Sequence, residues 1–180
     1  MPKYEELLQE FQGMARSLSN PESLMQRMSE RVHAEMARYN WVGFYLLDRN
    51  DSNLLVLGPF AGSFTPLQSI PLGQGLCGSA AAMGRTVVVN NVSQDPRYLS
   101  ASDIVKSELV APVFAHHHLI GAIDVESYFT ETFHQADREF IEACAAIAGR
   151  FFGNLAASST SHPTAPKAIP TKERTSHPNS

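Results

Sequence analysis

The chain has 180 residues, a formal net charge of −4 at pH 7 and a pI of about 5.9, so one domain of ordinary size is expected. The acidic balance argues against nucleic acid or an anionic membrane as the main partner, and no apolar run approaches the roughly 18 residues of a membrane span. Two cysteines, Cys77 and Cys144, cannot build a secreted disulfide framework, so a reducing cytoplasm is the expected location.

Two helices are predicted at the N-terminus, the first within residues 1–19 and the second after Asn20. Asn20 is a favourable N-cap, and Pro21 suits the first helical position. Apolar residues recur at three- and four-residue steps and predict one buried stripe on each helix. These residues are Leu7, Leu8, Phe11, Met14 and Leu18 in the first helix and Leu24, Met25, Met28, Val32 and Met36 in the second.

A strand hairpin is predicted next, from residues 41–47 and 53–57, with the second strand ending at 58–62. A short strand near 68–71 follows. The glycine-rich segment 73–78 leads into a short helix at 79–83, which ends at Gly84. Residues 87–89 form another short strand, and 90–101 form a polar loop.

The last elements are a hairpin of residues 107–114 and 119–127 and a long helix at about 135–156. They complete a main domain over residues 20–157. Residues 158–180 are rich in Ser, Thr and Pro, with Ile169 as their only large apolar residue, and this composition predicts a disordered tail.

Three carboxylates stand within the two strands of the last hairpin. Asp124 and Glu126 are two residues apart and therefore share a face. A turn of odd length around residues 116–118 would place Glu108 directly across from Glu126. Clustered buried carboxylates are costly without a partner, so we expect a cationic ligand group to bind there.

Both faces of this hairpin are largely apolar, so the sheet should be covered on both sides. Leu109, Ala111, Val113, Leu119, Ile123 and Val125 are expected on one face, and Val110, Pro112, Phe114, Ile120 and Ala122 on the other. With helices on one face, the carboxylates would lie in a pocket roofed by loops and the short helix.

Several sequence blocks, in order and spacing, resemble a GAF domain over about residues 20–155. They are Asp95-Pro96-Arg97-Tyr98, residues 106–113 (KSELVAPV) and residues 120–127 (IGAIDVES). The segments 40–47 (NWVGFYLL), 55–60 (LVLGPF) and 70–78 (IPLGQGLCG) are similar, more narrowly, to the free methionine-(R)-sulfoxide reductases. The resemblance implies an α+β fold with a central antiparallel sheet, N- and C-terminal helices on one face, and a loop-covered ligand pocket on the other.

The resemblance further implies a pocket for a free amino acid. Residues matching Glu108, Asp124 and Glu126 would hold its polar groups, and aromatic rings matching Trp41 and Tyr45 would enclose its apolar end. The family's chemistry uses a thiolate that attacks the sulfoxide sulfur, then a second thiol and a reductant such as thioredoxin.

This chain departs from that cysteine pattern. Counted without gaps, the family's nucleophilic cysteine falls on Ala101 and a further cysteine on Leu67, so only Cys77, a resolving-type position, is retained. Cys77 could be activated by a helix start or be a plain buried thiol. Cys144 is expected in the core.

Several of these residues could also have a purely structural role. Glu108 and Asp124 could bond backbone amides in the covering loops, and Trp41 with Tyr45 could be plain core. The run His116-His117-His118 lacks the same-face spacing of a metal site and is expected to be a solvated turn. We expect neither a metal nor a cofactor.

Three hypotheses follow. The leading one is a cytoplasmic binding or sensing module that keeps a pocket for the methionine or methionine sulfoxide class, with reductase activity lost or weakened. The second is a working reductase in which Cys77 attacks the sulfoxide and an external thiol, such as thioredoxin, resolves it. The third is a dimeric interaction module that pairs the apolar stripes of the first and last helices with a second copy.

Overall fold

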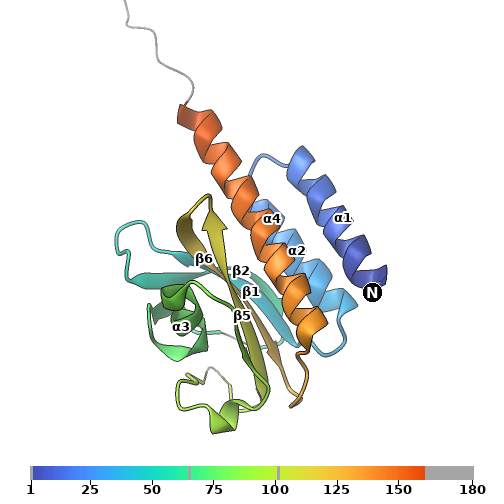
Figure 1. The fold of residues 1–180 in the computed structure, drawn as a ribbon, viewed down its shortest axis with the longest axis vertical. Coiled ribbons are helices and arrows are strands. Elements are labelled where there is room, and N and C mark those ends of the chain that lie inside the picture. The colour runs from blue at the N-terminus through green and yellow to red at the C-terminus, as the bar shows by residue number, and fades with distance from the viewer. Residues whose placement is uncertain (1, 65, 101, 161–180) are drawn as a thin grey trace, which may run out of the picture.

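Three long helices lie on one side of a central sheet in the computed structural model, which describes residues 2–64, 66–100 and 102–160 (Figure 1). They are α1 (Pro2–Ser17), α2 (Pro21–Glu35) and α4 (Gln135–Thr160). Asn20 caps α2 as predicted, because its side chain accepts a hydrogen bond from the Glu22 N–H at 2.9 Å. Helix α4 runs a few residues past the expected domain end at 157, and 161–180 of the predicted tail lie outside the described residues.

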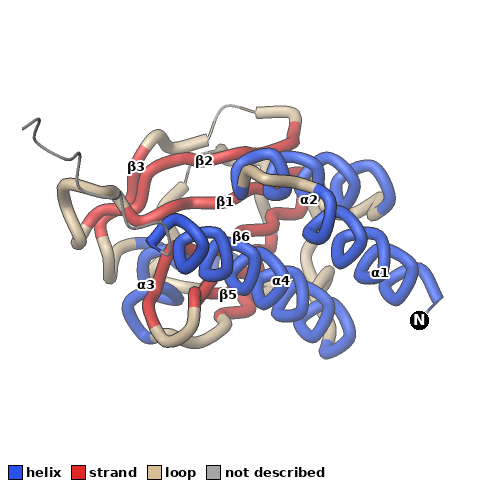
Figure 2. Tube along the Cα trace, turned by 90° about the horizontal axis from the view of Figure 1, so that it is seen from above, coloured by secondary structure: helices blue, strands red, loops and turns tan. Residues whose placement is uncertain are grey.

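The sheet has six strands in the described part of the chain, and every pairing is antiparallel. Their order is β3-β2-β1-β6-β5-β4, and Figure 2 labels the strands from β3 to β5 in this order. The strands are β1 (Trp41–Leu47), β2 (Leu54–Gly62), β3 (Ser69–Pro71), β4 (Val87–Val89), β5 (Ser107–Ala115) and β6 (His118–Ser127). The predicted α+β architecture is confirmed.

The predicted end of the second strand within 58–62 agrees with the structure, whereas the predicted start of the short helix is wrong. Strand β2 continues to Gly62, because Gly58 and Pro59 lie at an irregularity opposite β1, where proline does not interrupt the ladder. Helix α3 spans Gly75–Met83 and so starts four residues earlier than expected. Gly73 and Gly75 both adopt a positive φ, which lets the backbone turn sharply into the helix.

The β5–β6 hairpin has the predicted register but reaches it in another way. Ala115 pairs with His118, so the turn itself has two residues, and an irregularity adds one residue in β6 near Ile120. This extra residue restores the pairing of Glu108 with Glu126. It also exchanges two side chains relative to our prediction: Ile120 packs on the helix side, and Leu119 packs on the α3 side.

The sheet separates two apolar clusters. The larger lies between the sheet and the three long helices, and the smaller lies between the other face and α3. Leu7 and Phe11 of α1 and Ile141 and Cys144 of α4 are buried in the larger cluster. The stripes that the interaction hypothesis would offer to a second copy are therefore used within the chain.

A hydrogen-bonded group joins α1, the segment before β1 and the start of α4. Asp137 accepts from the hydroxyls of Tyr4 at 2.6 Å and Tyr39 at 2.5 Å, and from the backbone N–H of His134 at 2.8 Å. Burial, followed by the hydrogen bond to Asp137, raises the pKa of Tyr4 to about 12. No helix in the described residues combines the length and apolar character needed to cross a membrane.

Candidate functional site

The three predicted carboxylates gather on one face of adjacent strands. Glu108 of β5 stands opposite Glu126 of β6, which in turn stands opposite Trp41 of β1. Asp124 lies one step along the same face, between Val110 and Gly43. The alternation of side chains along the strands therefore brings together the three carboxylates that were predicted from the sequence.

These carboxylates are buried, with exposed fractions of 5% for Glu108, 2% for Asp124 and 7% for Glu126. Within the described residues, Oδ1 of Asp124 and Oε2 of Glu126 have no hydrogen-bond partner. The alternative that loop amides satisfy this cluster therefore does not account for these two oxygens. Unpaired buried acceptors of this kind are costly and favour a donor-bearing guest.

Burial and mutual repulsion favour the protonated carboxyls. Burial raises the pKa of Glu126 to about 7. Burial, and then the charge of Asp124, hold the pKa of Glu108 well above its usual range. Burial, and then the charge of Glu126, do the same for the pKa of Asp124.

Trp41 and Tyr45 form an aromatic wall beside the carboxylates. Trp41 is fully buried, and its ring stacks on those of Phe60 and Phe64 at centroid distances of 5.6 and 6.1 Å. Tyr45 lines the carboxylate cavity and donates a hydrogen bond from its hydroxyl to the Leu67 carbonyl oxygen at 2.8 Å. Trp41 itself adjoins this lining and is not part of it.

The sequence analysis did not predict Phe60 and Phe64 as part of this wall, although two glycines show that space is kept for the Trp41 ring. A Cβ atom at Gly43 would overlap the Trp41 indole and lie 2.6 Å from Cβ of Phe60, and one at Gly62 would also overlap the indole. The indole therefore lies across Gly43 of its own strand and Gly62 of the neighbouring β2, where no side chain is present. Gly43 and Gly62 make room for it.

Cys77 is the third residue of α3, inside the helix and not before it as expected. It is 2% exposed and lines the same cavity as the carboxylates. Burial, and then the charges of Asp124 and Glu108, hold the pKa of the Cys77 thiol well above its usual range. The prediction that a helix start could lower this pKa is wrong, because the carboxylates and burial act in the opposite direction.

The cavity is closed in this structure. Its volume is about 10 Å³, which is close to the space of a single water molecule. Leu99 helps to close it: a Cβ at Gly75 would lie 3.1 Å from Cβ of Leu99. An amino acid can enter only if this covering segment moves.

The structure also locates the other residues that the sequence analysis singled out. Leu67 lines the cavity, whereas Ala101 lies outside the described residues. Cys144 is fully buried in the larger core, as predicted, and His116, with a positive φ, lies in the β5–β6 turn away from the carboxylates. Within the described residues, no three His, Cys, Asp or Glu side chains are grouped so that they could hold a metal ion.

The chain is similar to known proteins in sequence and in fold. The GAF domain family model matches residues 20–151. A Saccharomyces cerevisiae protein named free methionine-R-sulfoxide reductase is 32% identical over 151 residues, which cover 79% of this chain and 82% of the relative.

Two solved structures extend the comparison. One is the free methionine-R-sulfoxide reductase from Neisseria meningitidis in complex with its substrate, with a TM-score of 0.80 and 29% identity, covering 87% of this chain and 91% of that one. The other is the fRMsr of Staphylococcus aureus, also in complex with substrate, with a TM-score of 0.75 and 32% identity. The match covers 82% of this chain and 94% of that chain.

Proposed function

The chain belongs to the GAF domain family and is related to the free methionine-R-sulfoxide reductases, and we propose that it binds a free amino acid of the methionine or methionine sulfoxide class. One observation carries the proposal. Glu108, Asp124 and Glu126 line a single buried cavity, and Asp124 and Glu126 each have one buried oxygen with no partner in the described residues. An ammonium group supplies both the positive charge and the donors that these oxygens lack.

The aromatic side chains beside the cavity support the rest of the assignment. A thioether or sulfoxide chain packs favourably against aromatic rings, and Tyr45 and the Trp41 stack supply these next to the carboxylates. The ligand then binds with its ammonium at the carboxylates and its sulfur end toward the rings. The relatives with a bound substrate are consistent with this class of ligand.

We propose further that reductase activity is lost or weakened. This proposal is supported by the ungapped count from Cys77, in which the family's nucleophilic cysteine falls on Ala101 and a further cysteine falls on Leu67. Neither side chain can act as a nucleophile. The remaining thiol, Cys77, is in the protonated form near neutral pH because of its raised pKa, and a thiol attacks poorly.

The second candidate is a working reductase that uses Cys77, and the position of Cys77 in the carboxylate cavity favours it. A bound ammonium would offset the carboxylate charges and ease thiolate formation. The thiolate would attack the sulfoxide sulfur, the oxygen would take up one proton from solvent and pass to Cys77 as a sulfenic acid, and methionine would leave. Two external thiols, such as those of thioredoxin, would then reduce the sulfenic acid and release water.

Calorimetric titration with methionine and with its (R)-sulfoxide tests the binding proposal. We expect saturable binding that weakens by about tenfold or more in Glu108→Gln, because the amide cannot ionise to pair with the bound ammonium. The control is Glu6→Gln on the exposed face of α1, which should bind like the wild type. Absence of binding by the wild type to either compound overturns the proposal.

Turnover separates the two candidates. NADPH consumption coupled through thioredoxin should stay flat with the (R)-sulfoxide if activity is lost. Turnover by the wild type that disappears in Cys77→Ser would instead establish the second candidate. Titration of the same Cys77→Ser variant shows whether the ligand still binds.

A further inference from the structure

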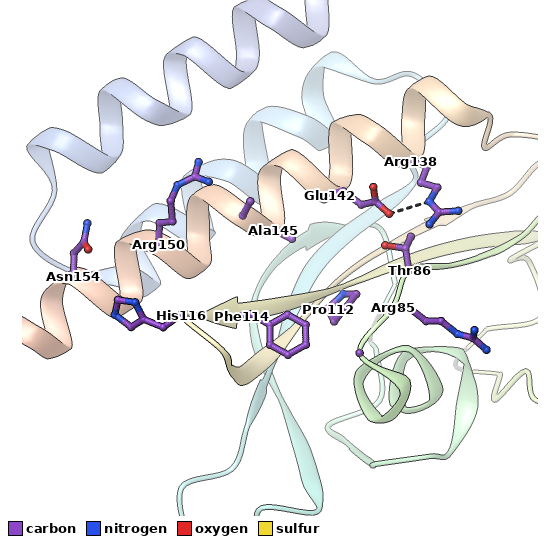
Figure 3. A pocket seen from close by; sticks show the side chains of 12 residues that line it. Arg85, Thr86, Pro112, Phe114, His116, Arg138, Glu142, Ala145, Arg150 and Asn154 are labelled. Atoms are coloured by element: carbon purple, nitrogen blue, oxygen red, sulfur yellow. Dashed lines mark hydrogen bonds and ion pairs between the residues drawn. The ribbon is translucent and has the colours of Figure 1, made fainter.

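A second concavity lies between α4 and the outer part of β5 (Figure 3). Its volume is about 530 Å³, within the roughly 300–1,000 Å³ typical of small-molecule sites. Strand β4 pairs with β5 only at residues 108–110, so the groove occupies the edge of the sheet where β4 has ended. None of its lining residues belongs to the carboxylate cavity.

The middle of the groove has an apolar floor. Pro112 and Phe114 of β5 and Ala145 and Ala146 of α4 line it. Phe114 is 36% exposed, and a Cβ at Gly84 would lie 3.4 Å from the tip of its ring. The floor therefore offers an aromatic surface that an apolar ligand body would cover.

The two ends of the groove are polar and cationic. Figure 3 shows Arg85, Thr86 and Arg138 at one end and His116, Arg150 and Asn154 at the other, with Phe114 and Pro112 between them. Arg138 and Arg150 are separated by about 18 Å along α4, at 1.5 Å per residue. The groove is thus elongated, with an arginine at each end that could meet an acidic group.

One carboxylate, Glu142, lies within this lining, and it is already engaged. It forms an ion pair with Arg138 at 2.9 Å. Arg85 and Arg150 form no ion pair with a carboxylate of the described residues. Positive charge therefore remains at both ends of the groove, in a chain whose net charge is −4.

We propose that this groove binds an elongated small organic molecule with an acidic group at each end and an apolar middle. Arg85 and Arg150 bind the two acidic groups, and the Phe114 surface packs against the middle. Both arginines extend outward at the rim in Figure 3, and both are exposed. Turning them onto a ligand breaks no ion pair and only the 3.4 Å hydrogen bond that Arg85 donates to Sδ of Met83, which keeps the cost of binding low. The ligand is opposite in charge to the ammonium bound by the carboxylate cavity.

Calorimetric titration with dodecanedioate and with its monomethyl ester tests the proposal, because the two probes share one length and differ by one charge. We expect the wild type to bind the diacid about fivefold more tightly, as an added contact between exposed charges allows. Arg85→Gln and Arg150→Gln should each abolish this preference. Equal binding of the two probes by the wild type overturns the proposal.

The matched control is Arg49→Gln, an exposed arginine that lines a different groove near the β1–β2 turn. It should retain the full preference for the diacid. If it loses the preference as Arg85→Gln does, the effect is one of overall charge and the proposed site is rejected. Unchanged thermal unfolding of all three variants shows that the substituted surfaces leave the fold intact.

Discussion

Glu108 and Glu126 face each other directly across β5 and β6, and they do so because β6 contains one extra residue near Ile120. Without that residue, the two-residue turn would pair Glu108 with Val125 and would turn the carboxylates to opposite faces. The irregularity far from the site therefore creates the charge cluster. The most direct consequence of this charge cluster is that the stability of the protein depends on pH.

The free energy of unfolding should fall as the pH rises from about 4.5 to 7. In this range the unfolded chain loses the proton of Glu126, while the folded chain keeps it because its pKa is about 7. The folded state therefore binds more protons, and the loss amounts to something on the order of 3 kcal/mol, at about 1.4 kcal/mol per pKa unit. Urea unfolding at several pH values measures it.

Glu126→Gln should remove this part of the pH dependence, because the amide does not titrate. Glu6→Gln serves as the control, since this α1 side chain is exposed, and it should keep the wild-type slope. An unchanged slope in Glu126→Gln would show that the proton is held elsewhere in the cluster.

Gly43→Ala should disrupt the aromatic wall. The new methyl group would overlap the Trp41 indole and crowd Phe60, so we expect a loss of about 1–3 kcal/mol in stability, typical of an overpacked core. Binding of methionine should weaken as well. Gly13→Ala in α1 is the control, because its nearest neighbour is an Arg16 nitrogen at 3.9 Å. It should be neutral or stabilising by up to about 1 kcal/mol. A stable Gly43→Ala variant with normal tryptophan fluorescence would contradict the prediction.

The sequence predicted the carboxylate cluster because strand periodicity depends only on residue spacing. Asp124 and Glu126 share a face in any strand, and the predicted odd-length turn would pair Glu108 with Glu126, a register that the structure reaches through a two-residue turn and one extra residue in β6. The positions of Leu119 and Ile120 could not be predicted, because nothing local reveals where an extra residue is inserted.

The effect of its surroundings on the pKa of Cys77 could not be predicted from the sequence either. Glycines before a helix suggested an activated thiol, whereas burial and the neighbouring carboxylates raise its pKa. These influences come from strands far along the chain, so only the assembled structure shows which effect is larger. The closure of the cavity could not be predicted either, because it depends on a long-range contact between Leu99 and Gly75.

Tyr4→Phe should reduce the free energy of unfolding by about 1 kcal/mol, the usual value of a hydrogen bond, because its hydroxyl donates to Asp137. The ring should stay in place, since it stacks on Phe140 with centroids 4.5 Å apart. Urea unfolding measures the change. Gln9→Ala, on the exposed side of α1, should have a smaller effect. An equal loss in both variants would indicate that the Asp137 hydrogen bond does not anchor α1.

Alkylation by iodoacetamide at pH 8 should show how reactive Cys77 is in the folded protein. Each unit by which the pKa rises lowers the thiolate fraction about tenfold, so we expect labelling much slower than that of free cysteine, and fast labelling in urea. Asp124→Asn should accelerate labelling of Cys77, because the amide cannot carry the negative charge that raises the pKa of this thiol. Cys144 is the internal control, because burial alone raises its pKa, and its rate should not respond to that substitution. Peptide mass spectrometry distinguishes the two cysteines. Labelling of folded Cys77 as fast as that of free cysteine would contradict the raised pKa and would favour the reductase that uses this thiol.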